Sequence, residues 1–569
     1  MTTQDFKAGG PEGPPLRMFA LILALLASVS SVLVGQGIWL DHRDLLKPLA
    51  ETWPTYSGDY TGRRFSALTQ VNRSNVKGLS LAWLTRFSGG VGGRGGGANV
   101  IIGGEGPDAA LTAGGATIKG SILAVNDVLY VTAPDNVWAV DARDGRTLWQ
   151  YFWKTRGGTH IANRGVGIYG DWLYFETPDN YLVSLDAKTG RERWHKVIAP
   201  FEHQYFSTTA PVIVGNHVIV GTGNDLDSPG FLQSFDPESG ALQWKFYTVP
   251  MTADDPWLSS WGSLDAARHG GAQPWMPGAY DPETKLYYFG TGNPTPAYVT
   301  KPRGENGDHL CTGCLIAVNV DTGKMAWYYQ TAPRDTHDWD SAQTPILFDG
   351  EFNGRPRKLV MTAARNGYFF VLDRLTGEHL RTTPFADVIN WSKGLNAKGQ
   401  PIHDATKDPS IGGALVSSST AGAVNWQPPS FSPQTGFFYV PVSSNYAMYY
   451  LTETDPRGAM GLGGMQQSQM SPNAVYLAAI DYKTGNIAWR HTYPGIGTGG
   501  NGVLSTAGGL VFAGDIAGNI IGYDAADGKV LWHSRIGNVS NAPQTYMVDG
   551  RQHVLVAAGD TLFAFSLQE

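Results

Sequence analysis

Short segments in which apolar and polar residues alternate recur along the chain, and the same turn interrupts each of them. Six copies end in tryptophan: AVDARDGRTLW, SLDAKTGRERW, SFDPESGALQW, AVNVDTGKMAW, AIDYKTGNIAW and GYDAADGKVLW. A seventh copy, VLDRLTGEHL, lacks the tryptophan. In all seven an Asp or Asn precedes a glycine by four residues, at positions 141, 186, 236, 319, 373, 481 and 524. Each copy predicts two strands joined by a tight turn.

The conserved spacing inside the copies assigns a role to each residue type. A period of two places the apolar side chains of a strand on one face. Asp-x-x-x-Gly is typical of a turn, because Asp bonds to nearby backbone amides and glycine accepts a positive φ without steric cost. The tryptophan comes eight residues after the Asp or Asn in six copies, and we expect it to pack between neighbouring sheets.

The distances between the turns predict a propeller. Successive copies lie 45, 50, 83, 54, 108 and 43 residues apart, and units of roughly 40–50 residues are the size of a propeller blade. The gap of 83 fits one blade with insertions, and the gap of 108 leaves room for a further blade around GFFYVPVS, residues 436–443. With an additional N-terminal strand, LSLAW at 79–83, we expect an all-β, closed, eight-bladed β-propeller over residues 53–569.

Three long segments interrupt the blades, at 89–116, 390–429 and 452–472. The first contains GGVGGRGGG, but no strand–glycine–helix context makes it a dinucleotide-binding motif. Long loops on a closed propeller usually cover the face where a ligand binds. The composition agrees with a turn-rich, aromatic-rich β protein, with 72 glycines, 25 tyrosines and 18 tryptophans. A net charge of −7 without a basic block argues against nucleic acid as a partner.

Residues 18–40 form an uncharged apolar segment, MFALILALLASVSSVLVGQGIWL, preceded by Arg17. A cleaved signal peptide has an apolar core of roughly 7–15 residues and a small-residue cleavage site, whereas a membrane span needs about 20 residues. The segment lies between the two and has no clear cleavage site, so we expect an uncleaved anchor rather than a cleaved signal. The resulting organisation is a cytoplasmic tail (1–17), an anchor helix (18–40), a linker (41–52) and an exported domain (53–569).

The chain has two cysteines, Cys311 and Cys314, in CTGC. Covalent haem attachment requires a histidine next, and position 315 is leucine. Two cysteines are also too few ligands for structural zinc. In an exported protein the pair forms either a local disulfide or two buried thiols.

The repeats, the opening segment WPTYSGDYTGRRFSALTQVNRSNVKGLSLAW (53–83) and an acidic cluster, TAPRDTHDWD (331–340), together resemble the pyrroloquinoline quinone (PQQ)-dependent dehydrogenases. That family includes methanol, ethanol and membrane glucose dehydrogenases, which are eight-bladed propellers with PQQ and Ca²⁺ on the central axis. The resemblance covers residues 53–569.

The resemblance implies a set of cofactor-binding residues. Arg164, in IANRG, matches an arginine that grips a PQQ carboxylate, which suits its planar fork. His160, four residues earlier, matches the glucose dehydrogenase type, and alcohol dehydrogenases carry adjacent cysteines where this chain has Gly158 and Thr159. The other matches are a threonine that bonds the cofactor, a tryptophan under the quinone, an arginine and an asparagine at its reactive oxygen: Thr208, Trp275, Arg365 and Asn425.

The same resemblance implies a metal site and a catalytic base. Asp225 and Asn293 match the Ca²⁺ ligands, and Asp340 matches the base and a further ligand. Oxygen ligands suit a hard cation, although Asp225 is one methylene shorter than the usual glutamate. Lanthanide-dependent relatives carry another aspartate where this chain has Ala342, which favours calcium. Two family contacts are replaced, by Lys119 for a glutamate and by Gly500 for a tryptophan.

These residues imply a periplasm-facing dehydrogenase that oxidises an alcohol or a sugar with PQQ and Ca²⁺. Because no haem motif is present, electrons would leave to a separate cytochrome or membrane quinone. The alternative is a cofactor-free PQQ-like propeller that serves as a binding or assembly module, since fold does not imply function. The missing cysteine pair and Lys119 favour the alternative, whereas Asp225, Trp275, Asn293, Asp340 and Arg365 together favour the enzyme.

Overall fold

The structure is a computed structural model that describes residues 1, 40–90, 99–108, 116–224, 226–341, 343–451, 463, 465–494 and 502–568, with backbone only at 42 and 465–473. Residues 40–569 form one compact unit. The expected anchor helix lies outside the described residues, apart from Leu40. No helix in the described part is long and apolar enough to cross a membrane. The expected linker at 41–52 contains η1 (His42–Leu46), a 3₁₀ helix, and buries Leu45 and Leu49 in the unit.

The described residues form eight sheets of four or five strands, numbered here in chain order. Sheet 1 contains β3 (Asn99–Gly103), β4 (Leu123–Val125), β5 (Val128–Ala133), β6 (Asn136–Asp141) and β7 (Thr147–Trp153). Sheet 2 contains β8 (Gly167–Tyr169), β9 (Trp172–Glu176), β10 (Tyr181–Asp186) and β11 (Glu192–Val197), and sheet 3 contains β12 (Val212–Val214), β13 (His217–Val220), β14 (Phe231–Phe235) and β15 (Leu242–Tyr247). Sheet 4 contains β16 (Ala279–Asp281), β17 (Leu286–Gly290), β18 (Cys314–Asn319) and β19 (Met325–Gln330).

The later strands complete the set. Sheet 5 contains β20 (Ile346–Phe352), β21 (Arg355–Ala363), β22 (Tyr368–Asp373) and β23 (His379–Pro384). Sheet 6 contains β26 (Ala414–Ser417), β27 (Ser430–Ser432), β28 (Phe437–Tyr450), β29 (Met465–Asp481) and β30 (Ile487–Thr492). Sheet 7 contains β1 (Phe65–Ser66), β31 (Val503–Thr506), β32 (Leu510–Gly514), β33 (Asn519–Asp524) and β34 (Val530–Arg535), and sheet 8 contains β2 (Leu79–Arg86), β35 (Gln544–Val548), β36 (Arg551–Ala558) and β37 (Thr561–Leu567). A two-stranded ribbon, β24 (Ser392–Leu395) with β25 (Pro401–His403), lies between sheets 5 and 6 in the chain.

The predicted turn joins the last two strands of sheets 1 to 7. Its glycine has a positive φ in every copy, from 65° to 77°, as the sequence predicted. The glycine also makes room for the tryptophan of the preceding sheet, because a Cβ on Gly190 would lie 2.6 Å from the Trp149 ring. The turn and the tryptophan are therefore two halves of one packing contact between sheets.

The tryptophans connect the sheets in sequence, as predicted. Five of them donate their indole N–H to a backbone carbonyl of the next sheet at 2.7–3.1 Å: Trp194, Trp244, Trp327, Trp489 and Trp532. In the copy without tryptophan, Thr383 donates instead to the carbonyl of Gly485 at 3.1 Å.

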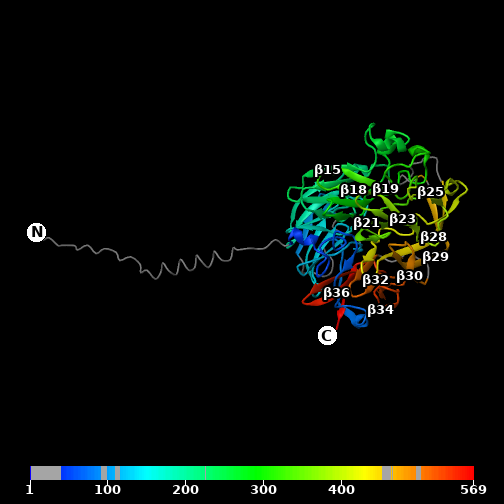
Figure 1. Cartoon of the computed structure of the whole chain (residues 1–569). Helices are drawn as coiled ribbons and strands as arrows, with labels where there is room; N and C mark the ends of the chain where they lie inside the picture. Colours follow the sequence, from blue (N-terminus) through cyan, green and yellow to red (C-terminus); the bar gives the residue numbers. More distant parts are fainter. Residues whose placement is uncertain are drawn as a thin grey trace. The chain divides into compact units, whose positions relative to one another are not determined.

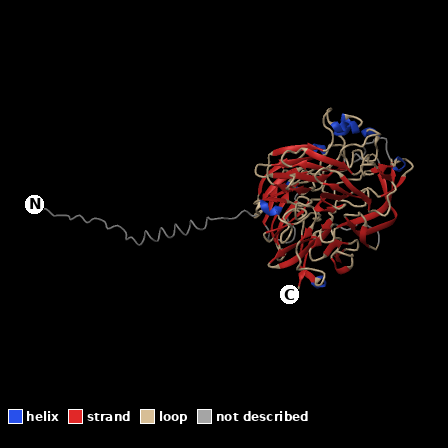
Figure 2. Cartoon of the chain, in the orientation of Figure 1, coloured by secondary structure: helices blue, strands red, loops and turns tan. Residues whose placement is uncertain are grey.

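The ring of sheets closes through the N-terminal strand. β2 pairs antiparallel with β37, the last strand of the chain, in sheet 8. Trp83, on β2, donates to the carbonyl of Ala142 in sheet 1 at 3.2 Å, which returns the contacts to their starting point. The prediction of an all-β propeller is confirmed, and Figure 2 shows how little of the described chain is helical.

One detail of the blade prediction is wrong. Residues 436–443, expected to mark a further blade in the gap of 108, lie on β28, which pairs with β29 in sheet 6 (Figure 1). The turn at Asp481 belongs to this same sheet, so long strands and insertions fill the gap. The sheet without a copy of the repeat is sheet 8, built from β2 and the C-terminal strands.

The opening segment, residues 53–83, makes buried contacts with several sheets. Tyr60 donates to the carbonyl of Ile213 at 2.6 Å, and Arg64 donates to Val503 and Pro543 at 3.1 and 2.8 Å. Tyr56 packs with Ala210, Met276, Trp275 and Trp426. The segment therefore packs against two tryptophans, Trp275 and Trp426, and supports their rings.

The six other short helical segments in the described part of the chain lie in loops. They are η2 (Val76–Gly78), η4 (Phe201–His203), η5 (Pro256–Ser260), α2 (Leu264–Arg268), η6 (Lys301–Arg303) and, between sheets 5 and 6, η7 (Ala405–Lys407). Asp255 caps η5 by accepting from the backbone of Trp257, and Ser263 caps α2 by accepting from Ala266. Side-chain caps of this kind satisfy amides that a short helix leaves free.

Candidate active site

Loops that connect strands and sheets surround a cavity of about 290 Å³. Seven of the residues predicted from the sequence line it: Arg164, Thr208, Trp275, Asn293, Asp340, Arg365 and Asn425. Four come from the connections between consecutive sheets from 1 to 5, two follow β17 and β21 within sheets 4 and 5, and Asn425 lies between β26 and β27 of sheet 6. Ring closure thus brings residues that are up to 261 positions apart into one small space.

Asp340 is the most tightly held acid of the cavity. It is only 5% exposed. Its Oδ1 accepts from the backbone N–H of Asn293 at 2.6 Å, and its Oδ2 accepts from the indole of Trp275 at 2.9 Å. Arg365 Nη2 lies 2.8 Å from the same Oδ2. Burial raises the pKa of Asp340, and the Arg365 charge opposes the shift. The carboxylate has a fixed direction, as a general base requires.

Arg365 is oriented by carbonyl groups as well as by Asp340. Its Nη1 donates to the carbonyls of Asp338 and Thr420 at 3.0 and 3.2 Å. Its Nη2 lies 3.5 Å from Asn425 Oδ1, which also accepts from the backbone of Trp426 at 2.7 Å. The geometry thus connects Arg365 to Asn425, the two residues expected at one oxygen of the quinone.

Trp275 forms a flat wall of the cavity close to two cations. The guanidinium of Arg164 lies 4.7 Å from its ring centre and that of Arg365 lies 5.7 Å away. Its indole bond to Asp340 prevents the ring from rotating. Trp426, which the sequence did not single out, lies 5.5 Å from Arg164 and also lines the cavity. The cavity is therefore lined by two indoles and suits a planar aromatic ligand.

Arg164 is buried and forms no salt bridge within the described residues. It is 3% exposed, and burial lowers its pKa to about 10. Its Nη1 has only a long bond, 3.4 Å, to the carbonyl of Thr208. Within the described residues, its Nε and the Oγ1 of Thr208 are buried and have no hydrogen-bond partner. Burial raises the pKa of nearby Glu176 well above its usual range, and the Arg164 charge opposes the shift.

Buried polar groups without a partner that line a cavity are available to bind a ligand, because a buried polar group that stays unpaired costs free energy. A carboxylate would satisfy the fork of Arg164 and the hydroxyl of Thr208. A flat, carboxylated molecule such as PQQ fits this combination of charge, indole surfaces and donors.

The predicted metal ligands are described only in part. Asn293 and Asp340 line the same cavity, and the Asn293 side chain donates through Nδ2 to the carbonyl of Pro294 at 2.9 Å, which leaves its oxygen for a cation. Asp225 lies outside the described residues. No group of three or more His, Cys, Asp or Glu side chains that could hold a metal occurs in the described part of the chain. The described oxygens fit two of the positions that a hard cation needs.

His160 does not line the cavity. Its Nε2 lies 2.7 Å from Asp135 Oδ2 and its Nδ1 lies 3.1 Å from the carbonyl of Gly158. The Asp135 carboxylate raises the pKa of His160. Lys119 does line the cavity, and its Nζ donates to the carbonyl of Ile161 at 3.0 Å. Burial lowers its pKa, and Arg164 adds to the effect.

The acidic cluster at 331–340 is a buried, hydrogen-bonded loop rather than a solvated one. Asp335 accepts from the backbone N–H of His337 at 3.0 Å and of Trp339 at 2.8 Å. His337 stacks on Trp339, with 4.3 Å between the ring centres, and the Trp339 indole donates to the carbonyl of Ser419 at 3.0 Å. Burial raises the pKa of Asp335 to about 6 and lowers that of His337 to about 4. Their contacts support the loop that ends in Asp340.

Several cavity residues escaped the sequence analysis, among them Phe206, Asn224, Gln273 and Trp426. A signal existed for one of them, because GTGN occurs twice, at 221–224 and 290–293. Both copies follow the second strand of a sheet and both place their asparagine in the cavity. The others have no local motif and are brought to the cavity by the fold.

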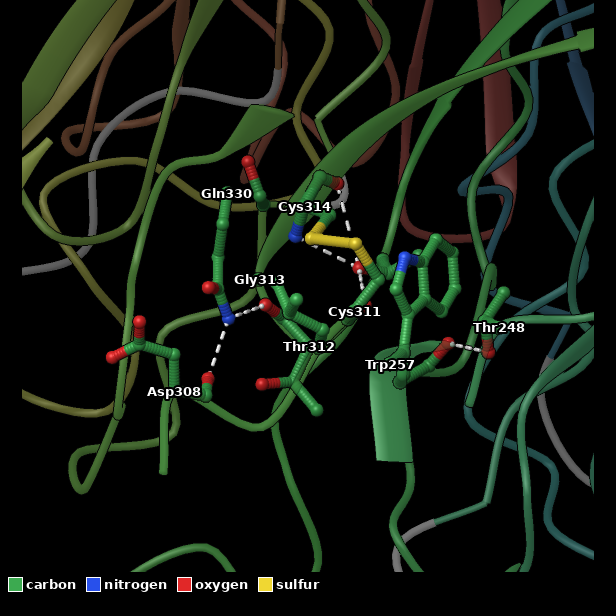
Figure 3. The surroundings of a disulfide bond; sticks show 12 residues. Thr248, Trp257, Asp308, Cys311, Thr312, Gly313, Cys314 and Gln330 are labelled. Carbon is green, nitrogen blue, oxygen red and sulfur yellow. Dashed lines mark hydrogen bonds between the residues drawn. A yellow bond between two sulfur atoms is a disulfide. The ribbon is translucent and has the colours of Figure 1, made fainter. Parts of the chain in front are cut away.

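The cysteines form a disulfide (Figure 3). Both are fully buried, at the start of β18. Of the two alternatives that the sequence left open, the disulfide is the one found.

A family model described as glucose/ethanol/alcohol dehydrogenase, β-propeller domain, matches residues 53–389. A quinoprotein alcohol dehydrogenase of Pseudomonas putida is 34% identical over 532 residues, which cover 88% of this chain and 84% of the relative. The chain belongs to the PQQ-dependent alcohol dehydrogenase family. A quinohemoprotein alcohol dehydrogenase of Comamonas testosteroni is 33% identical, over 89% of this chain and 72% of its own length.

Solved structures of this family have the same fold. A crystal structure of the Comamonas testosteroni quinohemoprotein alcohol dehydrogenase matches with a TM-score of 0.80 at 29% identity, covering 93% of this chain and 82% of that chain. A europium-containing methanol dehydrogenase matches with a TM-score of 0.78 at 25% identity, covering 92% and 99%. A second family model, for the outer membrane protein assembly factor BamB, matches residues 474–569. That range contains none of the residues that line the cavity.

Proposed function

We propose that this member of the family is an eight-bladed, PQQ- and Ca²⁺-dependent dehydrogenase that oxidises an alcohol on the periplasmic side of the membrane. The observation that carries the proposal is the cavity in which Arg164 and Thr208 offer unpaired donors at one wall while Asp340 and Arg365 are hydrogen-bonded to each other at another. The relatives named above are alcohol dehydrogenases, which favours an alcohol over a sugar. The eight sheets support the blade count.

Each residue has a physical task in this proposal. When bound, PQQ supplies the two-electron acceptor and Ca²⁺ supplies Lewis acidity. Asp340 would accept the hydroxyl proton of the alcohol on the carboxylate that Trp275 and Asn293 orient. Arg365 would stabilise negative charge on an oxygen beside it. Arg164 and Thr208 would bind a carboxylate, and Asn293 and Asp340 would contribute oxygens to the cation. Residues 18–40 would anchor the enzyme, and a separate cytochrome or membrane quinone would take the electrons.

The cofactor-free alternative is favoured by the missing cysteine pair, by Lys119 and by the match to the BamB model. Because that match lies in sheets 6 to 8, outside the cavity-lining residues, it reports the shared repeat rather than the cavity. A scaffold would also have no use for a buried, unpaired arginine, which costs stability.

The test is reconstitution of the purified chain with PQQ and Ca²⁺. We expect the absorption of the quinone to change on binding and a dye acceptor to be reduced when primary alcohols are added. Asp340→Asn should bind PQQ and fail to reduce the dye. A wild-type chain that neither binds PQQ nor oxidises any alcohol would favour the binding module.

A further inference from the structure

Thr291 links the cavity to the disulfide-closed turn at Cys311 and Cys314. It is fully buried and lies two residues before Asn293. Its Oγ1 donates to the carbonyl of Cys311 at 2.8 Å and accepts from the backbone N–H of Cys314 at 2.8 Å. Its own N–H donates to the carbonyl of Cys314 at 2.9 Å. One side chain and one amide thus attach the 291–293 segment to both ends of the turn.

The turn at 311–314 is also linked, through Thr291 and Thr331, to Ser341, the residue after Asp340. The carbonyl of Thr291 accepts from the N–H of Ser341 at 3.0 Å. Thr331 Oγ1 bonds to the carbonyl of Gly313 at 2.9 Å and to Ser341 Oγ at 2.8 Å. Gly313, inside the turn, donates to the carbonyl of Gly292 at 2.9 Å. Both segments that carry Asn293 and Asp340 are therefore hydrogen-bonded to one rigid element.

The turn is itself held from its far side. Cys311 donates to the carbonyl of Thr248 at 3.2 Å, and the side chain of Gln330 donates to the carbonyl of Thr312 at 3.0 Å (Figure 3). Trp257 lies beside the disulfide in the same view. Neither the cysteines nor Thr291 line the cavity, so they act on its contents only through the segments that they hold.

We propose that Thr291 and the Cys311–Cys314 disulfide are positioning residues that hold Asn293 and Asp340 at the separation needed to bind a divalent cation. This inference rests on the proposed function. The 2.6 Å bond from the Asn293 N–H to Asp340 Oδ1 shows that the two segments meet beside the predicted ligand oxygens. A small displacement of either segment changes the distance between those oxygens, and groups behind metal ligands control affinity for this reason.

The experiment compares matched variants of the full chain. Thr291→Val removes the hydroxyl at nearly constant volume, Thr291→Ser retains it, and Cys311→Ser with Cys314→Ser removes the covalent closure. Thr545→Val is the matched control, because Thr545 is equally buried but lies in sheet 8. Its Oγ1 also makes two hydrogen bonds: it donates to the carbonyl of His553 at 2.7 Å and accepts from the side-chain amide of Gln552 at 3.1 Å. Calorimetry measures Ca²⁺ binding to the apoprotein, and the thermal midpoint measures stability.

We expect Thr291→Val and the double cysteine variant to lower Ca²⁺ affinity about 10- to 100-fold, the range found for residues behind metal ligands. Thr291→Ser should restore affinity, and Thr545→Val should lower the thermal midpoint as much as Thr291→Val while leaving Ca²⁺ affinity unchanged. With saturating Ca²⁺, Thr291→Val should lower kcat more than it raises KM for the alcohol.

The outcomes separate the two proposals. A wild-type chain that binds neither Ca²⁺ nor PQQ would overturn the proposed function and this inference with it. A wild-type chain that binds both, with equal Ca²⁺ affinity in Thr291→Val or an equal loss in Thr545→Val, would overturn the positioning role alone. If Thr291→Val does not fold, the double cysteine variant decides by the same Ca²⁺ titration.

Discussion

Replacing Arg164 by methionine should have opposite effects on the empty protein and on cofactor binding. Burial lowers the pKa of Arg164 to about 10. Because the guanidinium is charged at neutral pH in both the folded and the unfolded state, this lowering corresponds to a penalty in the folded state of about 3 kcal/mol. Methionine removes that penalty. It also removes the contacts with Trp275 and Trp426, which offset about 1–2 kcal/mol.

The net expectation is that Arg164→Met stabilises the apoprotein by about 1–2 kcal/mol, a rise of roughly 1–2 °C in the thermal midpoint for a chain of this size. PQQ affinity should fall about 100-fold, because a charge-assisted bond to a carboxylate contributes about 1.5–3 kcal/mol. Differential scanning calorimetry of the apoprotein and a fluorescence titration with PQQ measure the two effects.

Arg64 supplies the matched control for this prediction. It is as buried as Arg164 and burial lowers its pKa to about 10 as well. Its guanidinium, however, donates to three carbonyls, of Val503, Tyr56 and Pro543. Arg64→Met should therefore destabilise the apoprotein, since it leaves those acceptors unpaired. If Arg164→Met lowers the thermal midpoint as Arg64→Met does, Arg164 is a structural residue and the reasoning about an unpaired cavity cation is refuted.

Three further predictions follow from the same geometry. Asp340→Asn should lower kcat by about 10²–10⁴-fold, with PQQ affinity nearly unchanged, because an amide cannot accept the proton; stopped-flow reduction of bound PQQ checks this, and residual activity above a tenth would contradict it. Lys119→Met should weaken PQQ binding several-fold by removing a positive charge from the wall of the cavity, whereas Lys119→Arg should not, as equilibrium titration would show. Because burial lowers the pKa of His337 to about 4, its contribution to stability is present above pH 6.5 and is lost as the pH falls toward 4; His337→Gln should flatten the fall of the thermal midpoint in that window, and an unchanged pH profile would exclude His337 as a cause.

Much of the architecture could be predicted because its determinants are local. Asp-x-x-x-Gly specifies its own turn through nearby amides and a positive φ at glycine, as at Gly190. The tryptophan at a fixed distance then marks the contact to the next sheet. The partner of β2 was less accessible, since β2 completes sheet 8 by pairing with a strand almost 500 residues away. No local pattern records which strands meet over that distance.

In the candidate site too, the residues that belong to local motifs could be predicted from the sequence and the others could not. Residues in recognisable motifs, such as Arg164, Trp275, Asn293, Asp340 and Arg365, were identified before the fold and line one cavity. His160 does not line the cavity, because a motif records the position of a residue and not the direction of its side chain, and the carboxylate of Asp135 binds its ring. Phe206 and Trp426 have no motif at all.

The sequence by itself determined the propeller, its turns, the family resemblance and the chemical identity of the residues around the cavity, because spacing and side-chain chemistry are properties of short segments. Only the tertiary structure decided that Arg164 lies unpaired against two indoles, that Asp340 is held by Asn293, Trp275 and Arg365, and that Thr291 connects them to a disulfide. Those facts depend on which loops meet when the ring of sheets closes, and that closure depends on contacts between distant parts of the chain.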